Sequence, residues 1–127
     1  MLELEPLVGL RVVAAPAALD GAVWHGDPVV TLRLAPDDAF ALDASRVDVD
    51  DPDAIVEGEF GFAGAWLTRD AIDALVVPHL EWALPVERPV LVQGSIAGVP
   101  GKLWLTDDGG LLLTAAAYAS ELEDRLR

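Results

Sequence analysis

The feature that most constrains this sequence is a strand–turn–strand pattern in its last third. Two apolar segments, residues 102–106 and 111–114, flank the tetrapeptide Asp107-Asp108-Gly109-Gly110. An Asp-Gly pair between apolar runs is a strong hairpin signal, because glycine adopts the positive φ angles that tight hairpin turns need. A further apolar stretch, residues 90–97, precedes the pair and predicts another strand. We therefore expect an antiparallel sheet here.

Two helices are expected from the spacing of apolar residues. Over residues 69–77 these residues recur at helical intervals, and Thr68 is a suitable N-cap. Pro78 should end or kink this helix near Val77, because proline has no N–H to donate to the helical ladder. Over residues 115–126 apolar side chains form one stripe, and acidic and basic residues four apart lie opposite it.

The organisation expected from these elements is one α+β domain spanning residues 1–127. No repeat, low-complexity linker or change in composition divides the chain. In the first part, Val30, Leu32 and Leu34 alternate as in a half-buried strand. We predict a mostly antiparallel sheet, with the helices at 69–77 and 115–126 packed on one of its faces.

Charge and composition exclude several classes of function. The chain has 22 acidic residues against 8 basic ones, which gives a formal charge of −14, yet 53% of its residues are hydrophobic. Enough apolar residues are present for a core, so the charge should lie on the surface. With Lys102 as its one lysine, the chain lacks the basic patch that nucleic acids or anionic membranes require. The absence of cysteine and of a signal-like start predicts a cytoplasmic protein.

No motif predicts a catalytic or cofactor site. His25 and His79 lie in separate segments, and the serines do not occupy a nucleophile motif. The acidic run from Asp48 to Asp53 resembles a calcium loop only in part, because the place of the turn glycine is taken by Asp53. We expect no bound metal, no cofactor and no catalytic residue, although a cation at the acidic run is left open. A non-catalytic role is favoured over an enzyme.

A protein partner is expected instead, either another subunit or a second copy of the chain. Tryptophan and other aromatic residues are enriched where proteins bind one another. Trp66 and Trp104 fall within predicted strands, where packing is expected. Four residues are assigned to a partner-facing surface: Trp24, His25, Trp82 and Tyr118.

The last third also resembles the end of the sarcosine oxidase gamma subunit family, which is related to the folate-binding aminomethyltransferase (glycine cleavage T protein) fold. The resemblance lies in the strand pair, the Asp-Asp-Gly-Gly turn, the Ala117-Tyr118-Ala119 segment and the terminal helix with Leu122 and Leu126. The phrase at residues 35–40 is similar to that family's Gly-Pro-Asp-Glu-Trp. The basic residue that the family places before its aromatic-Ala pair is absent. The resemblance implies a non-catalytic subunit of a flavoenzyme, with no active site to transfer.

Three hypotheses follow, in this order. The first is a non-catalytic interaction or structural subunit, as in a sarcosine-oxidase-like complex, and it predicts an apolar patch rimmed by carboxylates. The second is an acidic inhibitor or immunity-type protein, whose charge would speed its association with a basic partner. The third is a small ligand-binding domain or enzyme, which would require a pocket.

Overall fold

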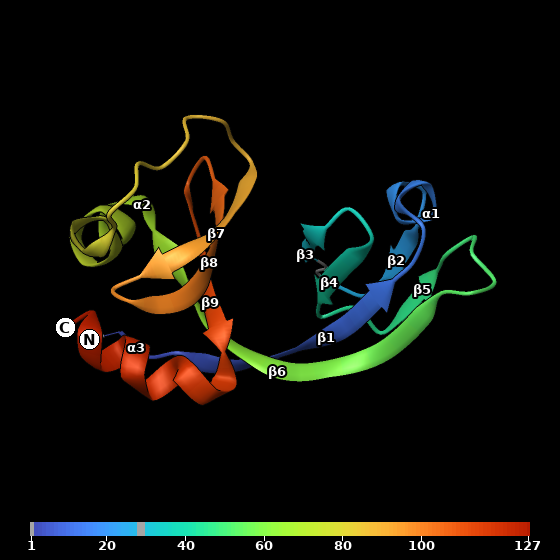
Figure 1. Cartoon of the computed structure of the whole chain (residues 1–127), viewed down its shortest axis with the longest axis horizontal. Helices are drawn as coiled ribbons and strands as arrows, with labels where there is room; N and C mark the ends of the chain where they lie inside the picture. The colour runs from blue at the N-terminus through green and yellow to red at the C-terminus, as the bar shows by residue number, and fades with distance from the viewer. Residues whose placement is uncertain (1, 28–29) are drawn as a thin grey trace. The chain divides into compact units, whose positions relative to one another are not determined.

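In a computed structural model that describes residues 2–27 and 30–127, the fold is α+β with mostly antiparallel strands (Figure 1). Backbone contacts gather in two compact units. The N-terminal unit is Leu7–Phe60, and the C-terminal unit is Gly61–Arg127 together with the residues up to Pro6. The predicted α+β class is confirmed, and the single-domain organisation over residues 1–127 stays a prediction.

The N-terminal unit pairs its strands in two antiparallel groups. β4 lies between β1 and β3, with Phe40 opposite Arg11 on one side and opposite Leu32 on the other, and β2 pairs with β5. β1 and β6 also contribute residues to the C-terminal unit. The elements in chain order are β1 (Glu5–Val13), α1 (Pro16–Asp20), β2 (Val23–His25), β3 (Val30–Ala35), β4 (Asp38–Leu42), β5 (Arg46–Asp48) and β6 (Ile55–Thr68).

A small apolar cluster holds α1 and the β2–β5 pair in this unit. Its buried members come from β1, α1 and β4 and the segment that joins the first two: Val12, Ala14, Leu19 and Ala39. Trp24 and Val47, which face each other across the β2–β5 pair, pack against it. The short β2–β5 pair thus gains burial that two isolated strands would lack.

The C-terminal unit orders its strands as β6-β9-β8-β7, all antiparallel. Its other elements in chain order are α2 (Arg69–Ala71), the π-helical turn η1 (Ile72–Val76), the 3-10 turn η2 (Val77–His79), β7 (Val90–Ile96), β8 (Val99–Thr106), β9 (Gly109–Ala115), the 3-10 turn η3 (Ala116–Tyr118) and α3 (Ala119–Arg125). The peptide bond between Arg88 and Pro89 is cis.

The predicted hairpin between β8 and β9 is confirmed, with a small difference in its turn. Thr106 pairs with Gly109, so the two turn residues are Asp107 and Asp108, and both glycines belong to β9. The β7–β8 hairpin also turns over two residues, Ala97 and Gly98, which both have positive φ angles of 52° and 81°. Two successive positive φ angles match the right-handed twist of the flanking strands.

Both predicted helices exist, with corrections to type and bounds. The segment predicted at 69–77 is α-helical only to Ala71 and continues as η1 and η2 to His79, so Pro78 lies inside the final 3-10 turn. The helix predicted at 115–126 begins one residue later as the 3-10 turn η3 and becomes the α-helix α3 at Ala119, which ends at Arg125. Ala115 is the last residue of β9, where it pairs with Phe62.

The two helical segments share one core with the sheet. Its buried members are Leu2, Ile72, Val76, Ile96, Val99, Leu103, Leu105, Leu112, Leu122 and Leu126. Leu103 and Leu112 are directly paired across β8 and β9, so their side chains project from the same face. Because residues of η1 and α3 pack against that face, the prediction of two helices on one face is confirmed (Figure 1).

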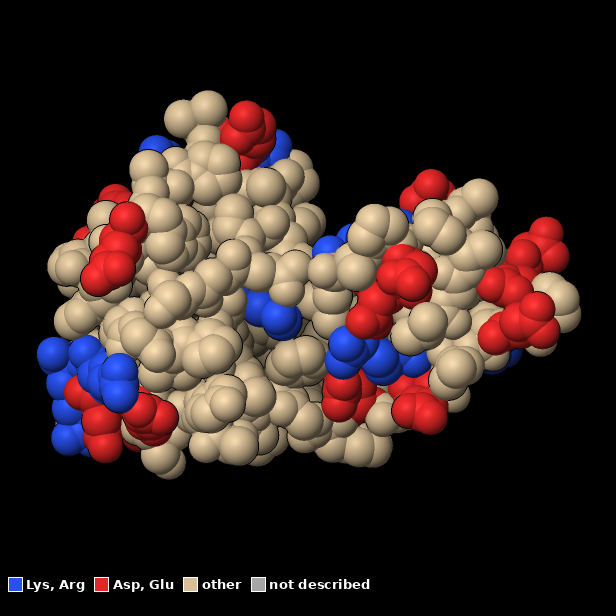
Figure 2. Space-filling model, in the orientation of Figure 1, with Lys and Arg blue, Asp and Glu red and all other residues tan. Residues whose placement is uncertain are grey.

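Two ion pairs lie on α3 and at its C-terminal end. In Figure 2 acidic and basic side chains lie together over this helix, where Arg125 binds Glu121 at 2.6 Å and Arg127 lies 3.4 Å from Asp124. Among the residues that the structure describes, no helix has the length and apolar character needed to cross a membrane.

Candidate functional site

A pocket of about 650 Å³ opens in the C-terminal unit, between the segment from α2 to η2, the loop that follows it and the β8–β9 hairpin. We call it the Arg88 pocket. Its apolar walls are Ile72, Val77, Leu80, Leu84, Val86 and Leu105. Four charged residues also line it: Arg69, Asp73, Arg88 and Asp107. Its volume lies within the range of about 300–1,000 Å³ typical of ligand sites.

The helical wall of the pocket is built by a capped start and an irregular continuation. The Thr68 side chain accepts a hydrogen bond from the amide of Ala71 at 3.1 Å, as its N-cap role predicted. In η1 the Val77 amide bonds to the carbonyl of Ile72, five residues back. Such π turns are rare and occur frequently at functional sites. This one buries Ile72 toward the core and places Asp73 on the pocket.

Trp82 forms a further wall and fixes the loop. Its indole N–H donates to the carbonyl oxygen of Ser95 on β7 at 2.9 Å. Its ring lies against Gly94, where an added Cβ would come within 3.3 Å of the indole nitrogen. The glycine in mid-strand is thus the place where the indole meets the β7 backbone. Trp82 is half-buried and packs on the core of the unit.

Arg88 is held in one orientation by the loop itself. Its Nη1 donates to the carbonyl oxygens of Pro85 at 2.6 Å and Glu87 at 2.7 Å. Its Nε and Nη2 have no hydrogen-bond partner among the described residues. Arg11, in the other unit, uses the same two nitrogens on Asp38, at 2.6 Å and 2.7 Å. The Nε–Nη2 edge of an arginine is thus shown within this chain to bind a carboxylate in a bidentate manner.

The pairing of arginines distinguishes the pocket from the rest of the molecule. Five arginines form ion pairs with carboxylates: Arg11, Arg33, Arg46, Arg125 and Arg127. Arg69 and Arg88 form none with any residue that the structure describes, although acidic residues outnumber basic ones almost threefold. Both line the Arg88 pocket. Arg69 is also the first residue of α2, where the helix dipole disfavours a cation.

The residues assigned to a partner surface are distributed over both units. Trp24 and His25 belong to the N-terminal unit, and Trp24 is half-buried against its apolar cluster. Trp82 lines the Arg88 pocket. Tyr118 is 41% exposed and lines a second pocket of about 370 Å³ in the same unit, together with Phe62, Gln93 and Lys102. The partner-facing role of these four residues stays a prediction.

His25 takes part in a surface cluster with β5. Its Nε2 lies 2.8 Å from Oδ2 of Asp48 and 3.2 Å from Nη2 of Arg46, its neighbour across the β2–β5 pair. The hydrogen bond from His25 lowers the pKa of Asp48 below its ordinary value of 3.8. The contact joins residues 23 positions apart, which no local sequence signal predicts.

The acidic run has structural roles for two of its carboxylates. Asp48 binds His25, and Asp51 accepts hydrogen bonds from the backbone amides of Ala15 at 2.8 Å and Asp53 at 2.9 Å. These two amides lower the pKa of Asp51 below 3.8. Across residues 2–27 and 30–127, no group of three or more His, Cys, Asp or Glu side chains is arranged to hold a metal ion.

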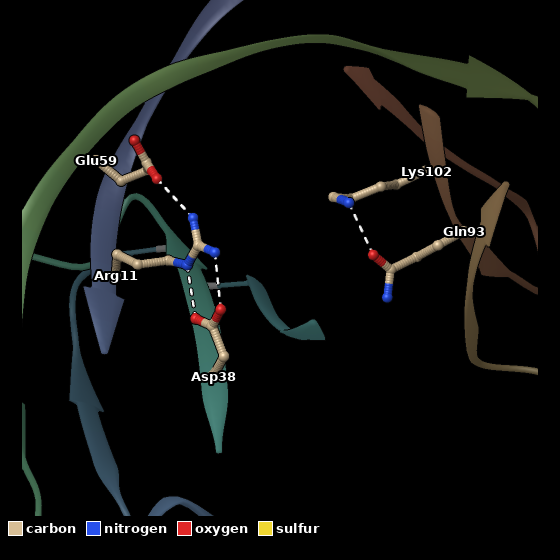
Figure 3. Close-up of polar contacts among 5 residues, drawn as sticks. All are labelled: Arg11, Asp38, Glu59, Gln93 and Lys102. Carbon is tan, nitrogen blue, oxygen red and sulfur yellow. Dashed lines mark hydrogen bonds and ion pairs between the residues drawn. The ribbon is translucent and has the colours of Figure 1, made fainter. Parts of the chain in front are cut away.

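Three polar contacts that sequence patterns did not single out are shown in Figure 3. In the N-terminal unit, Arg11 bridges Asp38 and Glu59, with its Nη1 at 2.8 Å from Glu59. The hydrogen bond to Asp38 raises the pKa of Arg11 further, against the opposing effect of burial. In the C-terminal unit, Lys102 donates to Gln93 across β7 and β8 at 2.7 Å.

The arginines of the pocket were also missed by the sequence patterns. Arg69 had a detectable signal, since a cation at the first position of a helix opposes the helix dipole. Arg88 had no such signal, because its lack of an ion pair is a property of the tertiary structure.

Trp66 was expected to pack within a strand, but it is 55% exposed.

Comparison with known proteins adds no relative. No protein-family model matches the chain, and no curated protein or solved structure matches it. The resemblance to the sarcosine oxidase gamma subunit family therefore stays a prediction that rests on its short motifs.

Proposed function

We propose that this chain is a non-catalytic binding module that engages a protein partner through the Arg88 pocket. One observation carries the proposal: in a chain of charge −14, the two arginines that form no ion pair with any described residue line the same apolar-walled pocket. Arginine–carboxylate pairing is common elsewhere in this molecule. Two guanidinium groups that bind no carboxylate among the described residues therefore favour an external partner for this pocket.

The rim of the pocket supports a macromolecular partner over a ligand held wholly inside. Val86 is 91% exposed and Val77 is 38% exposed, and both line the pocket. Apolar side chains at the mouth of a pocket gain from burial when a larger surface covers them. A polypeptide segment can fill the pocket and cover this rim together.

A subunit of a sarcosine-oxidase-like complex is a specific form of this proposal, and it is supported by the motif resemblance alone. It predicts that the chain copurifies with a flavin enzyme and that the complex survives high salt, since apolar contacts are not screened. Loss of the complex on adding salt would instead favour the acidic-inhibitor hypothesis.

The proposal is tested by site-specific photocrosslinking in an extract of the source cells. A benzophenone side chain is placed at Val86, on the pocket rim, and in a matched sample at Val23, which is 54% exposed in the N-terminal unit. We expect a discrete adduct from position 86 that is lost when Arg88 is replaced by Gln, and no such adduct from position 23. An adduct at position 86 that persists in the Arg88→Gln chain would refute the role of the pocket.

A further inference from the structure

Resting on the proposed function, we infer that the Arg88 pocket binds the C-terminal end of a partner polypeptide that finishes in an apolar residue. The terminal carboxylate is held by Nε and Nη2 of Arg88, and the last side chain lies against the apolar walls. The inference follows from the orientation of Arg88, the composition of the walls and the charges around them.

The orientation of Arg88 selects a planar, bidentate anion. Two loop carbonyls hold Nη1, so the guanidinium is fixed before a ligand arrives. The remaining edge presents two parallel N–H groups, the arrangement that matches the two oxygens of a carboxylate. Because the group is already ordered, binding costs less side-chain entropy than it would for a mobile arginine.

The apolar walls select what is attached to the carboxylate. Ile72, Leu80 and Leu84 line the pocket that also contains Arg88. A C-terminal residue carries its carboxylate and its side chain on the same Cα, so one residue supplies both an anion and an apolar group. An internal Asp or Glu instead joins its carboxylate to a short stem between two peptide groups, which the apolar walls would leave unpaired.

The acidic residues in the pocket sharpen this selectivity. Asp73 and Asp107 also line it, and the chain as a whole is strongly negative. An anion is therefore repelled unless it makes short, direct contact with the arginines. Arg69 adds a second cation to the same pocket and offsets part of this repulsion. Binding should depend on hydrogen-bond geometry more than on positive charge as such.

The test uses the whole ¹⁵N-labelled chain and simple probes, with the Trp82 indole N–H signal as the reporter. N-acetyl-leucine carries a terminal carboxylate beside an apolar side chain, and N-acetyl-leucinamide lacks only the charge. We expect the amide to bind at least about tenfold more weakly, because it loses two charge-assisted hydrogen bonds. Acetate, which lacks the apolar group, should bind more weakly by a similar factor.

Further probes separate other sources of the anion. Equal or tighter binding of inorganic phosphate would overturn the assignment to a carboxylate. Equal or tighter binding of the α-amide of N-acetyl-aspartic acid, whose one carboxylate is on the side chain, would overturn the assignment to a chain terminus. If acid and amide bind equally well, the inference fails while the pocket still acts as an apolar docking site. If no probe binds and position 86 gives no Arg88-dependent adduct, the proposed function fails as well.

Matched variants locate the binding group. Arg88→Lys keeps the charge but removes the bidentate edge, and it should weaken N-acetyl-leucine binding about tenfold. Arg33→Gln, the control for Arg69→Gln, removes one positive charge from the N-terminal unit and should leave the affinity unchanged. Because Arg88 also holds the loop, Arg69→Gln is a second test at a residue outside that loop, and a several-fold loss of affinity is expected. Unchanged binding in both pocket variants would overturn the inference.

Asp107→Asn should strengthen the binding of N-acetyl-leucine, whereas the arginine variants should weaken it. It removes a negative charge from the pocket without changing its size, so N-acetyl-leucine should bind several-fold more tightly. Weaker binding in this variant would mean that Asp107 attracts the probe, which contradicts a carboxylate as the group that enters the pocket.

Discussion

The indole nitrogen of Trp82 donates a hydrogen bond to the carbonyl oxygen of Ser95 at 2.9 Å, and this contact ties the loop of the Arg88 pocket to β7. The loop contains no helix or strand between His79 and Val90, so its position depends on such side-chain contacts. The same contact places the ring on Gly94 and completes one wall of the pocket.

Trp82→Phe should lower the free energy of unfolding by about 1 kcal/mol, because it removes this hydrogen bond and leaves the Ser95 carbonyl without the indole donor. Urea denaturation at neutral pH measures the change. Trp66→Phe is the control, since Trp66 is 55% exposed, and it should alter stability by no more than about 0.5 kcal/mol. Equal losses in the two variants would show that the indole hydrogen bond contributes nothing.

Arg11 is expected to stabilise the N-terminal unit through Asp38 and Glu59. Both carboxylate side chains are only 22% exposed, and Arg11→Gln removes the cation that each of them binds at 2.6 Å and 2.8 Å. Breaking a partly buried ion pair costs more stability than breaking an exposed one and less than breaking a fully buried one. We therefore expect the free energy of unfolding to fall by about 2 kcal/mol. Arg127→Gln breaks a pair whose side chains are 62% and 70% exposed and should cost less than about 0.5 kcal/mol.

Asp51 gives the stability a defined dependence on pH. Its pKa is lowered in the folded chain by the amides of Ala15 and Asp53, so the folded state favours the charged form. The resulting stabilisation is fully present above the unfolded value of about 3.8 and is lost as the pH falls through the lower folded pKa. Asp51→Ala should therefore be less stable than the parent chain at pH 7. The difference should diminish as the pH falls below about 3.8, and a difference that stays constant down to full protonation of Asp51 would contradict the assignment.

Ala97 has a φ of 52°, in the left-handed region that disfavours a side chain with a Cβ. Ala97→Gly should raise the free energy of unfolding by about 0.5–1 kcal/mol, after the added chain entropy of glycine is subtracted. Ala117→Gly, in the η3 turn with ordinary φ, should lower it by about 0.5–1 kcal/mol. Thermal and urea unfolding of the two variants would show opposite signs, and a loss at both positions would contradict the reading of Ala97.

Local signals predicted much of the fold. The Asp-Asp-Gly-Gly turn, the Thr68 cap and the helix end near Pro78 each depend on a few neighbouring residues, and the structure contains all of them. The predicted start of the terminal helix at Ala115 was wrong. Ala115 pairs with Phe62, more than fifty residues away, and this pairing extends β9 into the segment predicted as helix. The π turn at Ile72–Val76 was predicted as α-helix, because the apolar spacing of a single π turn resembles that of an α-helix.

The candidate site was less predictable from the sequence than the fold. Trp82 was singled out because it is a tryptophan at the end of an element, but its position against Gly94 depends on how a long loop folds back on β7. Arg88 could be recognised only once the other arginines were seen to be paired with carboxylates distant in sequence, such as Arg11 with Asp38. Pairing over such separations follows from strand register, which no local motif encodes.

The arginine Nε–Hε signals of the ¹⁵N-labelled chain, recorded with and without N-acetyl-leucine, test the central claim most directly. If Arg69 and Arg88 bind the ligand while the other arginines have structural roles, the Arg88 signal should move most and the Arg69 signal should follow. The signals of the five ion-paired arginines should stay in place. Shifts confined to ion-paired arginines, or an Arg88 signal that does not respond at saturating probe, would contradict the assignment.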